Sequence, residues 1–243
     1  MDRSRPIYEQ IFKKYWDKTL PFSVTIELTY RCNLGCVHCY VENNLKEQEL
    51  TTLEVKQLLN KLAQEKVIFL TFTGGEIFLR EDLFEIASYA RKNGFMIKLF
   101  TNGTLITPTI ADMIKGVCPE AVEISMYGAT AQTHEDITKV SGSFEKSINA
   151  FKLLKERGIT TIFKPTLMRQ NFAEYSEMKS LAEKLKAVPR FSITITARND
   201  GGTTPYQYRL SNDQLATFFQ QFTYDEEEDI EEICKQIRGS SKF

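Results

Sequence analysis

The stretch SVTIELTYRCNLGCVHCYVEN, residues 23–43, joins a strand-like segment directly to a cluster of cysteines. Residues 23–30 alternate in polarity and are rich in β-forming types, which predicts a β-strand. Cys32, Cys36 and Cys39 follow at once, in what we call the cysteine loop (Cys32–Cys39). Whether this loop belongs to a larger site depends on the pattern in the rest of the chain.

Strand-like and helix-like segments alternate along the rest of the chain. The first helical pattern, residues 51–66, opens with a capping box at Thr51 and Glu54. The predicted strands are residues 23–30, 67–73, 95–101, 121–127, 159–168 and 190–196. Strands separated by helices of about 10 to 15 residues pair in parallel, with the helices covering the sheet. We therefore predict an α/β fold, a partial (β/α)6 TIM-like barrel with parallel strands.

Composition limits the class of protein. The chain has 243 residues, is 42% hydrophobic and carries a net charge of −1, which allows a sizeable core but gives no basic footprint for nucleic acid. No apolar run reaches the roughly 20 residues of a membrane span, and the start lacks the apolar centre of a secretory signal. We expect a cytoplasmic protein with no nucleic-acid or membrane partner. Thiols stay reduced there, so clustered cysteines are more often metal-binding or catalytic than disulfide-bonded.

The unusual sequences each follow a predicted strand. The cysteine loop follows the first strand, TGGE (73–76) the second, TNG (101–103) the third and SMYG (125–128) the fourth. In parallel barrels the loops after the strands gather at one rim, where ligands bind. Adjacent glycines let the backbone approach a ligand closely and adopt positive φ. These loops are therefore predicted to form one site.

Three thiolates leave a metal centre incompletely coordinated. Structural zinc and four-cysteine clusters are saturated, whereas catalytic metals keep an open position. A cluster held by three cysteines could bind a second molecule at its open iron. The alternative is zinc with His38 as fourth ligand, which would require a residue between Cys36 and Cys39 to curl back onto the same ion. Glu76 could hold an ammonium group near the open iron, or serve as an acid at a helix N-terminus.

The spacing C-x3-C-x2-C after a first strand, with T-G-G-E after a second, resembles the radical S-adenosylmethionine (radical SAM) superfamily over residues 22–200. The resemblance implies that Cys32, Cys36 and Cys39 ligate a 4Fe-4S cluster and that S-adenosylmethionine binds the fourth iron. In that superfamily the reduced cluster cleaves the sulfonium to a 5′-deoxyadenosyl radical, which abstracts hydrogen from a substrate. One departure is Ile77, where many relatives have a proline that stiffens the turn.

The same resemblance implies the residues that bind S-adenosylmethionine. They are His38, Tyr40, Gly74, Gly75, Glu76, Asn102, Ser125 and Lys164. His38 and Tyr40 flank the last cysteine, where the family packs the adenine, and the glycine pair with Glu76 receives the methionyl ammonium. Ser125 stands where relatives contact the ribose or the carboxylate. Taken singly, Asn102 and Ser125 would be ordinary loop hydrogen-bonders. No residue is assigned as catalytic.

Two reactive side chains outside these motifs are expected to be structural. His134 has acidic neighbours and is predicted at a polar surface, and Cys118 is predicted to be a small buried hydrophobe.

Residues 123–159 and 196–215 resemble the branch whose members modify peptides and carry a C-terminal auxiliary-cluster (SPASM) domain. Only Cys234 follows the predicted barrel, so this domain is expected to be lacking, through truncation or loss; Cys234 could equally be a helix residue in an acidic tail. The predicted domains are an N-terminal helical extension (1–21), the radical SAM core (22–200), and a C-terminal linker and helix or the start of a truncated SPASM domain (201–243).

Three functions stay open. The first is a radical SAM enzyme acting on a peptide or protein, with an electron donor such as flavodoxin or ferredoxin. The second is a radical SAM enzyme of small-molecule cofactor or haem biosynthesis. The third is a non-enzymatic or decayed iron-sulfur barrel that senses, scaffolds or transfers electrons. A reconstituted, reduced protein that makes no 5′-deoxyadenosine would favour the third.

Overall fold

A curved, six-stranded parallel sheet organises the molecule. The computed structural model describes residues 7–41 and 49–220. The strands run in the order β1-β2-β3-β4-β5-β6, and they are β1 Ser23–Thr29, β2 Phe69–Gly74, β3 Met96–Thr101, β4 Ala121–Ser125, β5 Thr161–Lys164 and β6 Val188–Pro189. Each neighbouring pair is parallel. The predicted partial barrel of parallel strands is confirmed.

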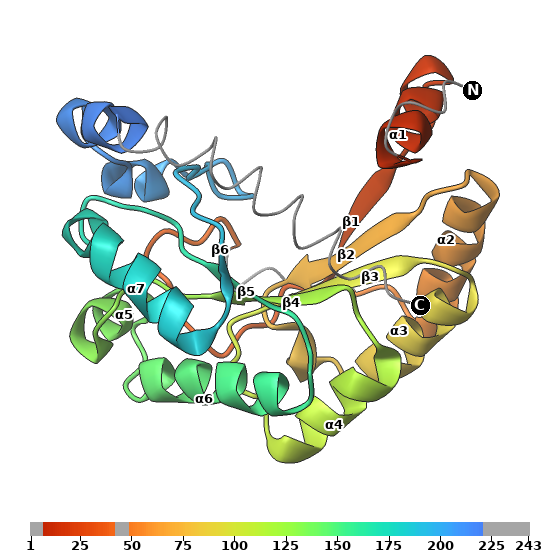
Figure 1. Cartoon of the computed structure of the whole chain (residues 1–243), viewed down its shortest axis with the longest axis horizontal. Helices are drawn as coiled ribbons and strands as arrows, with labels where there is room; N and C mark the ends of the chain where they lie inside the picture. Colours follow the sequence, from red (N-terminus) through yellow and green to blue (C-terminus); the bar gives the residue numbers. More distant parts are fainter. Residues whose placement is uncertain (1–6, 42–48, 221–243) are drawn as a thin grey trace.

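Helices line the outer face of the sheet (Figure 1). They are α1 Ile7–Asp17, α2 Thr52–Gln64, α3 Leu83–Lys92, α4 Pro108–Val117, α5 Ala131–Thr138, α6 Ser143–Glu156 and α7 Tyr175–Leu185, and residues 212–220 are also helical. Short 3-10 turns occupy η1 Ile77–Leu79, η2 Phe172–Glu174 and η3 Thr204–Tyr208. Helix α1 stands apart from the row formed by α2, α3, α4, α6 and α7 (Figure 1).

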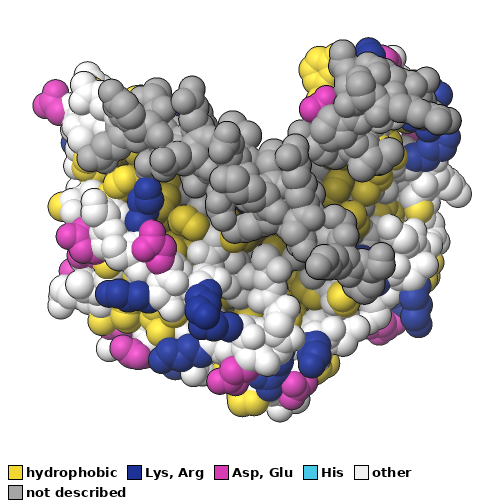
Figure 2. All heavy atoms as spheres, in the orientation of Figure 1, with side chains coloured by type: hydrophobic (Ala, Val, Ile, Leu, Met, Phe, Trp, Pro, Cys, Tyr) yellow, Lys and Arg dark blue, Asp and Glu magenta, His cyan; other side chains and the backbone are white. Residues whose placement is uncertain are grey.

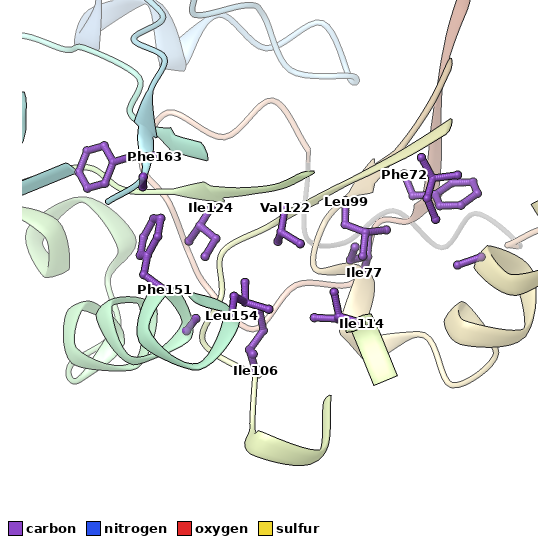
Figure 3. Close-up of a cluster of buried hydrophobic side chains, with 14 of the residues drawn as sticks. Phe72, Ile77, Leu99, Ile106, Ile114, Val122, Ile124, Phe151, Leu154 and Phe163 are labelled. Atoms are coloured by element: carbon purple, nitrogen blue, oxygen red, sulfur yellow. The ribbon is translucent and has the colours of Figure 1, made fainter. Parts of the chain in front are cut away.

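Alternate strand side chains build the core. The outward-facing residues pack against the helices, and those labelled in Figure 3 include Phe72, Leu99, Val122, Ile124 and Phe163 from strands, with Ile114, Phe151 and Leu154 from helices. Because side chains alternate along a strand, their neighbours face the concave side. There Lys164 of β5 pairs with Glu123 of β4 and lies over the Phe100 ring of β3. The concave side is therefore charged, while the helical side is apolar.

Two helix starts carry capping boxes, the first of them as predicted. Thr51 and Glu54 exchange both bonds of a capping box at α2. Ser211 and Gln214 do the same before residues 212–220, where the Ser211 N–H donates to Gln214 Oε1 at 3.0 Å. Such reciprocal bonds satisfy N–H groups that a helix terminus leaves without a partner.

The sixth strand differs from its prediction. We predicted residues 190–196, but β6 is Val188–Pro189, followed by one isolated bridge between Ser192 and Thr166. The Arg190 and Ser192 N–H groups still donate to β5-side carbonyls, the second of them Pro165 O at 2.9 Å. Pro165 has no N–H with which to return the bond that would continue the ladder. The strand is therefore short, and an irregular loop replaces its predicted second half.

Parts of the prediction lie outside the described residues, namely Cys234, the acidic run at 225–232 and the suggested start of an auxiliary domain.

Within the ranges that the structure describes, no helix combines the length and apolarity needed to cross a bilayer. Lys, Arg, Asp and Glu side chains are interspersed over the outer helical surface (Figure 2).

Candidate functional site

The cysteine loop is fastened to the C-terminal end of α5. The Gly35 N–H donates to Thr138 O at 2.9 Å, and the Val37 N–H donates to Ile137 O at 3.0 Å. Just past the loop, Tyr40 O accepts from the Asn199 N–H at 2.9 Å. Helix α5 was not among the predicted elements, yet its last carbonyls hold the loop that carries the three thiols.

The thiols are partly buried and influence one another. Burial raises the pKa of Cys32, Cys36 and Cys39, and charge on either of the other two thiols raises the pKa of Cys36 further. Backbone hydrogen bonds from Leu34 and Val41 lower the pKa of Cys32 and Cys39 respectively. Donors aimed at sulfur stabilise the thiolate that a metal requires. The backbone in and just after the loop therefore supplies hydrogen bonds to Cys32 and Cys39.

Gly74 and Gly75 bring the turn after β2 against the chain that leads into the cysteine loop. A Cβ on Gly74 would lie 2.1 Å from Thr29 O, and one on Gly75 would lie 2.2 Å from Arg31 O. Gly74 also has φ +133°, which disfavours other residues. The Gly75 N–H donates to Thr29 O at 2.7 Å. The glycines therefore have a close backbone neighbour in the protein itself, and their contact with S-adenosylmethionine stays a prediction.

Glu76 is fully buried, and protein donors engage its carboxylate. Its residue exposure is 0%. Thr101 Oγ1 donates to both oxygens at 2.8 and 2.9 Å, and the backbone N–H groups of Asn102 and Phe78 donate at 2.8 and 3.2 Å. Burial raises the pKa of Glu76, and these hydrogen bonds oppose that rise. Glu76 caps the N-terminus of η1, which agrees with the alternative prediction of an acid at a helix N-terminus. Its contact with an ammonium group stays a prediction.

Asn102 brings the turn after β3 to the first cysteine. Its Nδ2 atom donates to Asn33 Oδ1 at 2.9 Å and lies 3.9 Å from Cys32 Sγ. Its Oδ1 atom accepts from Thr104 N at 2.9 Å and from Thr104 Oγ1 at 2.6 Å. The cysteine loop, the glycine turn and the TNG turn therefore meet at one rim, as the order of the motifs predicted.

His38 turns inward beneath the cysteine loop. Its ring meets the Tyr127 ring edge-on, with centroids 4.6 Å apart. Burial lowers the pKa of His38 to about 4. Its Nδ1 atom is buried and has no hydrogen-bond partner in the described part of the chain. Contact of this ring with adenine stays a prediction.

Tyr40, Ser125 and Lys164 complete the predicted set. The Tyr40 hydroxyl donates to the Glu27 carboxylate of β1. Ser125 is the register partner of Lys164 at the ends of β4 and β5. Lys164 Nζ lies 2.5 Å from Glu123 Oε2, so its charge is paired within the protein. The contact of each with S-adenosylmethionine stays a prediction.

Sequence reasoning placed the SMYG loop at the site but gave Tyr127 no role, and it missed Arg198; both residues lie near the cysteines. Tyr127 is buried, and its hydrogen bond lowers the pKa of Cys36, against the larger effect of burial. The charge of Arg198 lowers the pKa of Cys39, against the larger rise that burial causes. The buried Nε atom of Arg198 has no hydrogen-bond partner among the described residues. Tyr127 follows the fourth strand directly, and the rule that loops after strands form the site selected its loop but not this side chain. Arg198 stands near the end of the predicted core (22–200), where no motif pointed to a site residue.

Two predictions about single residues were wrong. His134 is 1% exposed because its ring packs between those of Tyr127 and Phe144, and its Nδ1 atom accepts from the Tyr127 N–H. Cys118 is exposed because it ends α4 in a left-handed conformation with φ 51°. It therefore lies on a helix terminus and not in the core.

The donor set fits a cluster better than a single ion. Across residues 7–41 and 49–220, no group of three or more His, Cys, Asp or Glu side chains could hold one metal ion. The geometry therefore gives no support to zinc held by the cysteines and His38. In an iron-sulfur cluster each thiolate binds a different iron, so the sulfurs need not converge on one point. Three thiols, each with a hydrogen-bond donor to its sulfur, suit that chemistry.

A family profile described as "Radical SAM superfamily" matches residues 26–200. The chain belongs to the radical SAM superfamily. This confirms the resemblance seen in the motifs, and the superfamily implies an iron-sulfur cluster and S-adenosylmethionine. The profile match includes the cysteine loop, the glycine turn and the ends of the later strands.

Among curated radical SAM relatives, the AdoMet-dependent heme synthase of Methanosarcina barkeri is 33% identical over 74% of this chain and 53% of its own length. The mycofactocin maturase MftC of Mycobacterium tuberculosis is 33% identical over 71% of this chain and 44% of its own. The chain thus spans about half the length of these relatives. Crystal structures of Streptococcus suis SuiB, bound to S-adenosylmethionine or to the precursor peptide SuiA, superpose with TM-scores of 0.73 at 15% identity. They cover 90% and 91% of this chain and 52% and 50% of SuiB, and show that the fold is shared.

Proposed function

We propose that this protein is a radical SAM enzyme that binds a 4Fe-4S cluster through Cys32, Cys36 and Cys39 and acts on a peptide substrate. The observation that carries the proposal is the meeting of the cysteine loop with the Gly74–Gly75 turn and Asn102 at one rim of a parallel barrel. When bound, the cluster and S-adenosylmethionine would supply a 5′-deoxyadenosyl radical that abstracts hydrogen from the substrate.

The chain's own residues would place these groups and limit water at the rim. The backbone bonds from Gly75 and Val37 fix the two sides of the cysteine loop. The packed rings of His38, Tyr127 and His134 fill the space beneath it. Exclusion of water protects a reactive radical from side reactions. The rim therefore provides a rigid base for the chemistry.

A peptide substrate is supported by the relatives. MftC is a maturase, and SuiB has been solved with the precursor peptide SuiA. A cytoplasmic electron donor such as flavodoxin or ferredoxin would reduce the cluster. The second candidate is a small-molecule substrate of haem biosynthesis, favoured by the M. barkeri heme synthase, which matches this chain at the same identity as MftC. Cationic Lys164 and Arg190 on the concave face suit carboxylate groups in either substrate.

Anaerobic reconstitution tests the proposal. Wild type, Cys36→Ala and Cys118→Ala are loaded with iron and sulfide, reduced, and given S-adenosylmethionine. We expect about four irons per chain and 5′-deoxyadenosine in wild type and Cys118→Ala, and neither in Cys36→Ala. Cys118 is a matched control because it is exposed at the end of α4. A loaded wild type that forms no 5′-deoxyadenosine would leave the non-enzymatic barrel as the better interpretation.

Deuterium transfer separates the two substrate classes. The loaded enzyme is incubated with deuterated peptides or with a deuterated tetrapyrrole. Label in 5′-deoxyadenosine from the peptide supports the first candidate, and label from the tetrapyrrole supports the second, because the radical takes hydrogen from its true substrate. Mass spectrometry of 5′-deoxyadenosine measures the transfer.

A further inference from the structure

A continuous polar network connects Glu76, Asn102 and Cys32 at the rim. We propose that Asn102 is a positioning residue for the cluster, and that its side-chain amide donates an N–H to Cys32 Sγ and so sets the reduction potential of the site. The inference rests on the proposed function, because it assumes a cluster on Cys32. It assigns to Asn102 a role toward sulfur, which differs from contact with S-adenosylmethionine.

The orientation of the Asn102 amide is determined by its neighbours. Its Oδ1 atom accepts from Thr104 N and Thr104 Oγ1, at 2.9 and 2.6 Å. Because a carbonyl oxygen accepts and an amide nitrogen donates, the Nδ2 atom must occupy the opposite position, toward the cysteine loop. There it has two hydrogens and two acceptors, Asn33 Oδ1 at 2.9 Å and Cys32 Sγ at 3.9 Å. Each N–H therefore has its own partner.

The backbone of Asn102 is fixed as firmly as its side chain. Its N–H donates to the fully buried Glu76 carboxylate at 2.8 Å, and its carbonyl accepts from Ser147 Oγ at 2.7 Å. Asn102 itself is 9% exposed. A satisfied buried network of this kind specifies one arrangement, because any displacement leaves polar groups without partners. The amide cannot turn away from Cys32 without breaking several of these bonds.

The polar network also reaches the cysteine loop through side chains of α6 and α5. The single Ser147 hydroxyl hydrogen is shared between Asn102 O and Ser143 O, which lies 2.9 Å from Ser147 Oγ, and the Ser143 and Thr138 hydroxyls lie 2.8 Å apart. Thr138 O accepts from the Gly35 N–H at 2.9 Å. Asn102 is therefore connected to the loop at Cys32 directly and at Gly35 through α5 and α6. This closed arrangement holds the segment from Cys32 to Gly35 at both ends.

An N–H directed at a ligating sulfur favours the more negative, reduced cluster, and hydrogen bonds to sulfur are among the factors that set cluster potentials. Removing the amide should therefore make the midpoint potential more negative.

The test is a redox titration of the reconstituted cluster, followed by electron paramagnetic resonance (EPR). Asn102→Leu keeps the size and neutrality of the side chain but removes both N–H groups. We expect a midpoint potential more negative than that of wild type and an altered EPR signal, with iron still bound. The matched control is Asn171→Leu, because Asn171 is also buried but, among the described residues, its Nδ2 donates to the carbonyls of Tyr127 and Thr166 and not to sulfur. That control is expected to lose stability and keep the wild-type potential.

Thr104→Val supplies a milder variant. It removes the hydroxyl that orients the amide, so we expect a smaller shift in the same direction. Loss of iron from both Asn102→Leu and Thr104→Val, with unchanged melting of the iron-free proteins, would also support positioning. Loaded variants with the wild-type potential would overturn the inference and leave the proposed function standing. A wild type that binds no cluster would instead overturn the proposed function.

Discussion

The rim above β1, β2 and β3 and the concave wall of β4, β5 and β6 each bury one carboxylate, but they satisfy it differently. On the rim, the donors to Glu76 within the described part of the chain are all neutral, namely Thr101 and two backbone N–H groups. On the wall, Glu123 is 3% exposed and faces two cations, Lys164 at 2.5 Å and the half-exposed Arg190 at 3.7 Å. Neutral short-range bonds fix one geometry, whereas ion pairs with an exposed partner can be shared with an arriving ligand.

Under the proposed function, this difference suits a division of roles between the two regions. The rim joins three consecutive loops through close backbone contacts, which suits a cofactor that must be placed identically in every turnover. On the wall, Lys164 and Arg190 pair with Glu123 but remain partly exposed. Partly exposed cations of this kind suit a substrate with acidic groups. The following predictions test the rigidity of the first region and the looser pairing of the second.

The largest effect is expected for Gly75→Ala. The new Cβ would lie 2.2 Å from Arg31 O, a backbone atom that cannot move without displacing the start of the cysteine loop. We expect the free energy of unfolding to fall by about 3 kcal/mol or more, and iron loading to be lost. Urea denaturation and iron quantification measure the two effects.

Gly116→Ala is the matched control for that change. Gly116 lies inside α4, and a Cβ there would meet nothing within 4 Å. Alanine in a helix should stabilise the protein by about 0.5 to 1 kcal/mol and leave iron loading unchanged. Equal behaviour of the two alanine variants would show that the close approach of the glycine turn to the cysteine loop is unimportant.

The contrast also explains what the sequence could predict. The rim was foreseeable because each of its motifs follows a strand, and parallel pairing brings strand ends together. Glu76 was foreseen at the site, but its partners Thr101 and Asn102 depend on how the turn after β3 folds beside it. The Glu123 pairing was not foreseen, because strand alternation places a charge on a face without identifying its partner in the next strand. The second half of the sixth strand was predicted wrongly because the residue that interrupts its ladder, Pro165, lies just after β5 and not in the sixth segment itself.

An intermediate effect is expected for Lys164→Met on the concave wall. The change keeps the aliphatic length but leaves the buried Glu123 carboxylate with Arg190 alone, at 3.7 Å. Because Lys164 is itself 33% exposed, we expect a loss of about 2 kcal/mol, less than for a fully buried pair. Lys98→Met, which breaks a looser pair with Glu120 at 3.6 Å between two part-exposed side chains, should cost less than about 1 kcal/mol. Equal losses in urea denaturation would contradict the special position of Glu123.

The smallest effect concerns pH and the rings beneath the rim. Burial lowers the pKa of His134 to about 4, from 6.5. A base with a lowered pKa binds fewer protons when folded, so its contribution to stability is complete above pH 6.5 and is lost as the pH falls toward 4. For one such histidine the loss between pH 7.5 and pH 5 is at most about 2 kcal/mol.

His134→Asn isolates this contribution. An asparagine oxygen can accept the Tyr127 N–H that His134 Nδ1 now accepts, but it does not titrate. His38, whose pKa burial also lowers to about 4, keeps its own share. We therefore expect urea denaturation of the variant to show about half of the wild-type loss between pH 7.5 and pH 5. An undiminished loss would mean that His134 becomes protonated without unfolding the protein, and that the layer beneath the rim is less rigid than the hydrogen-bonded network above it.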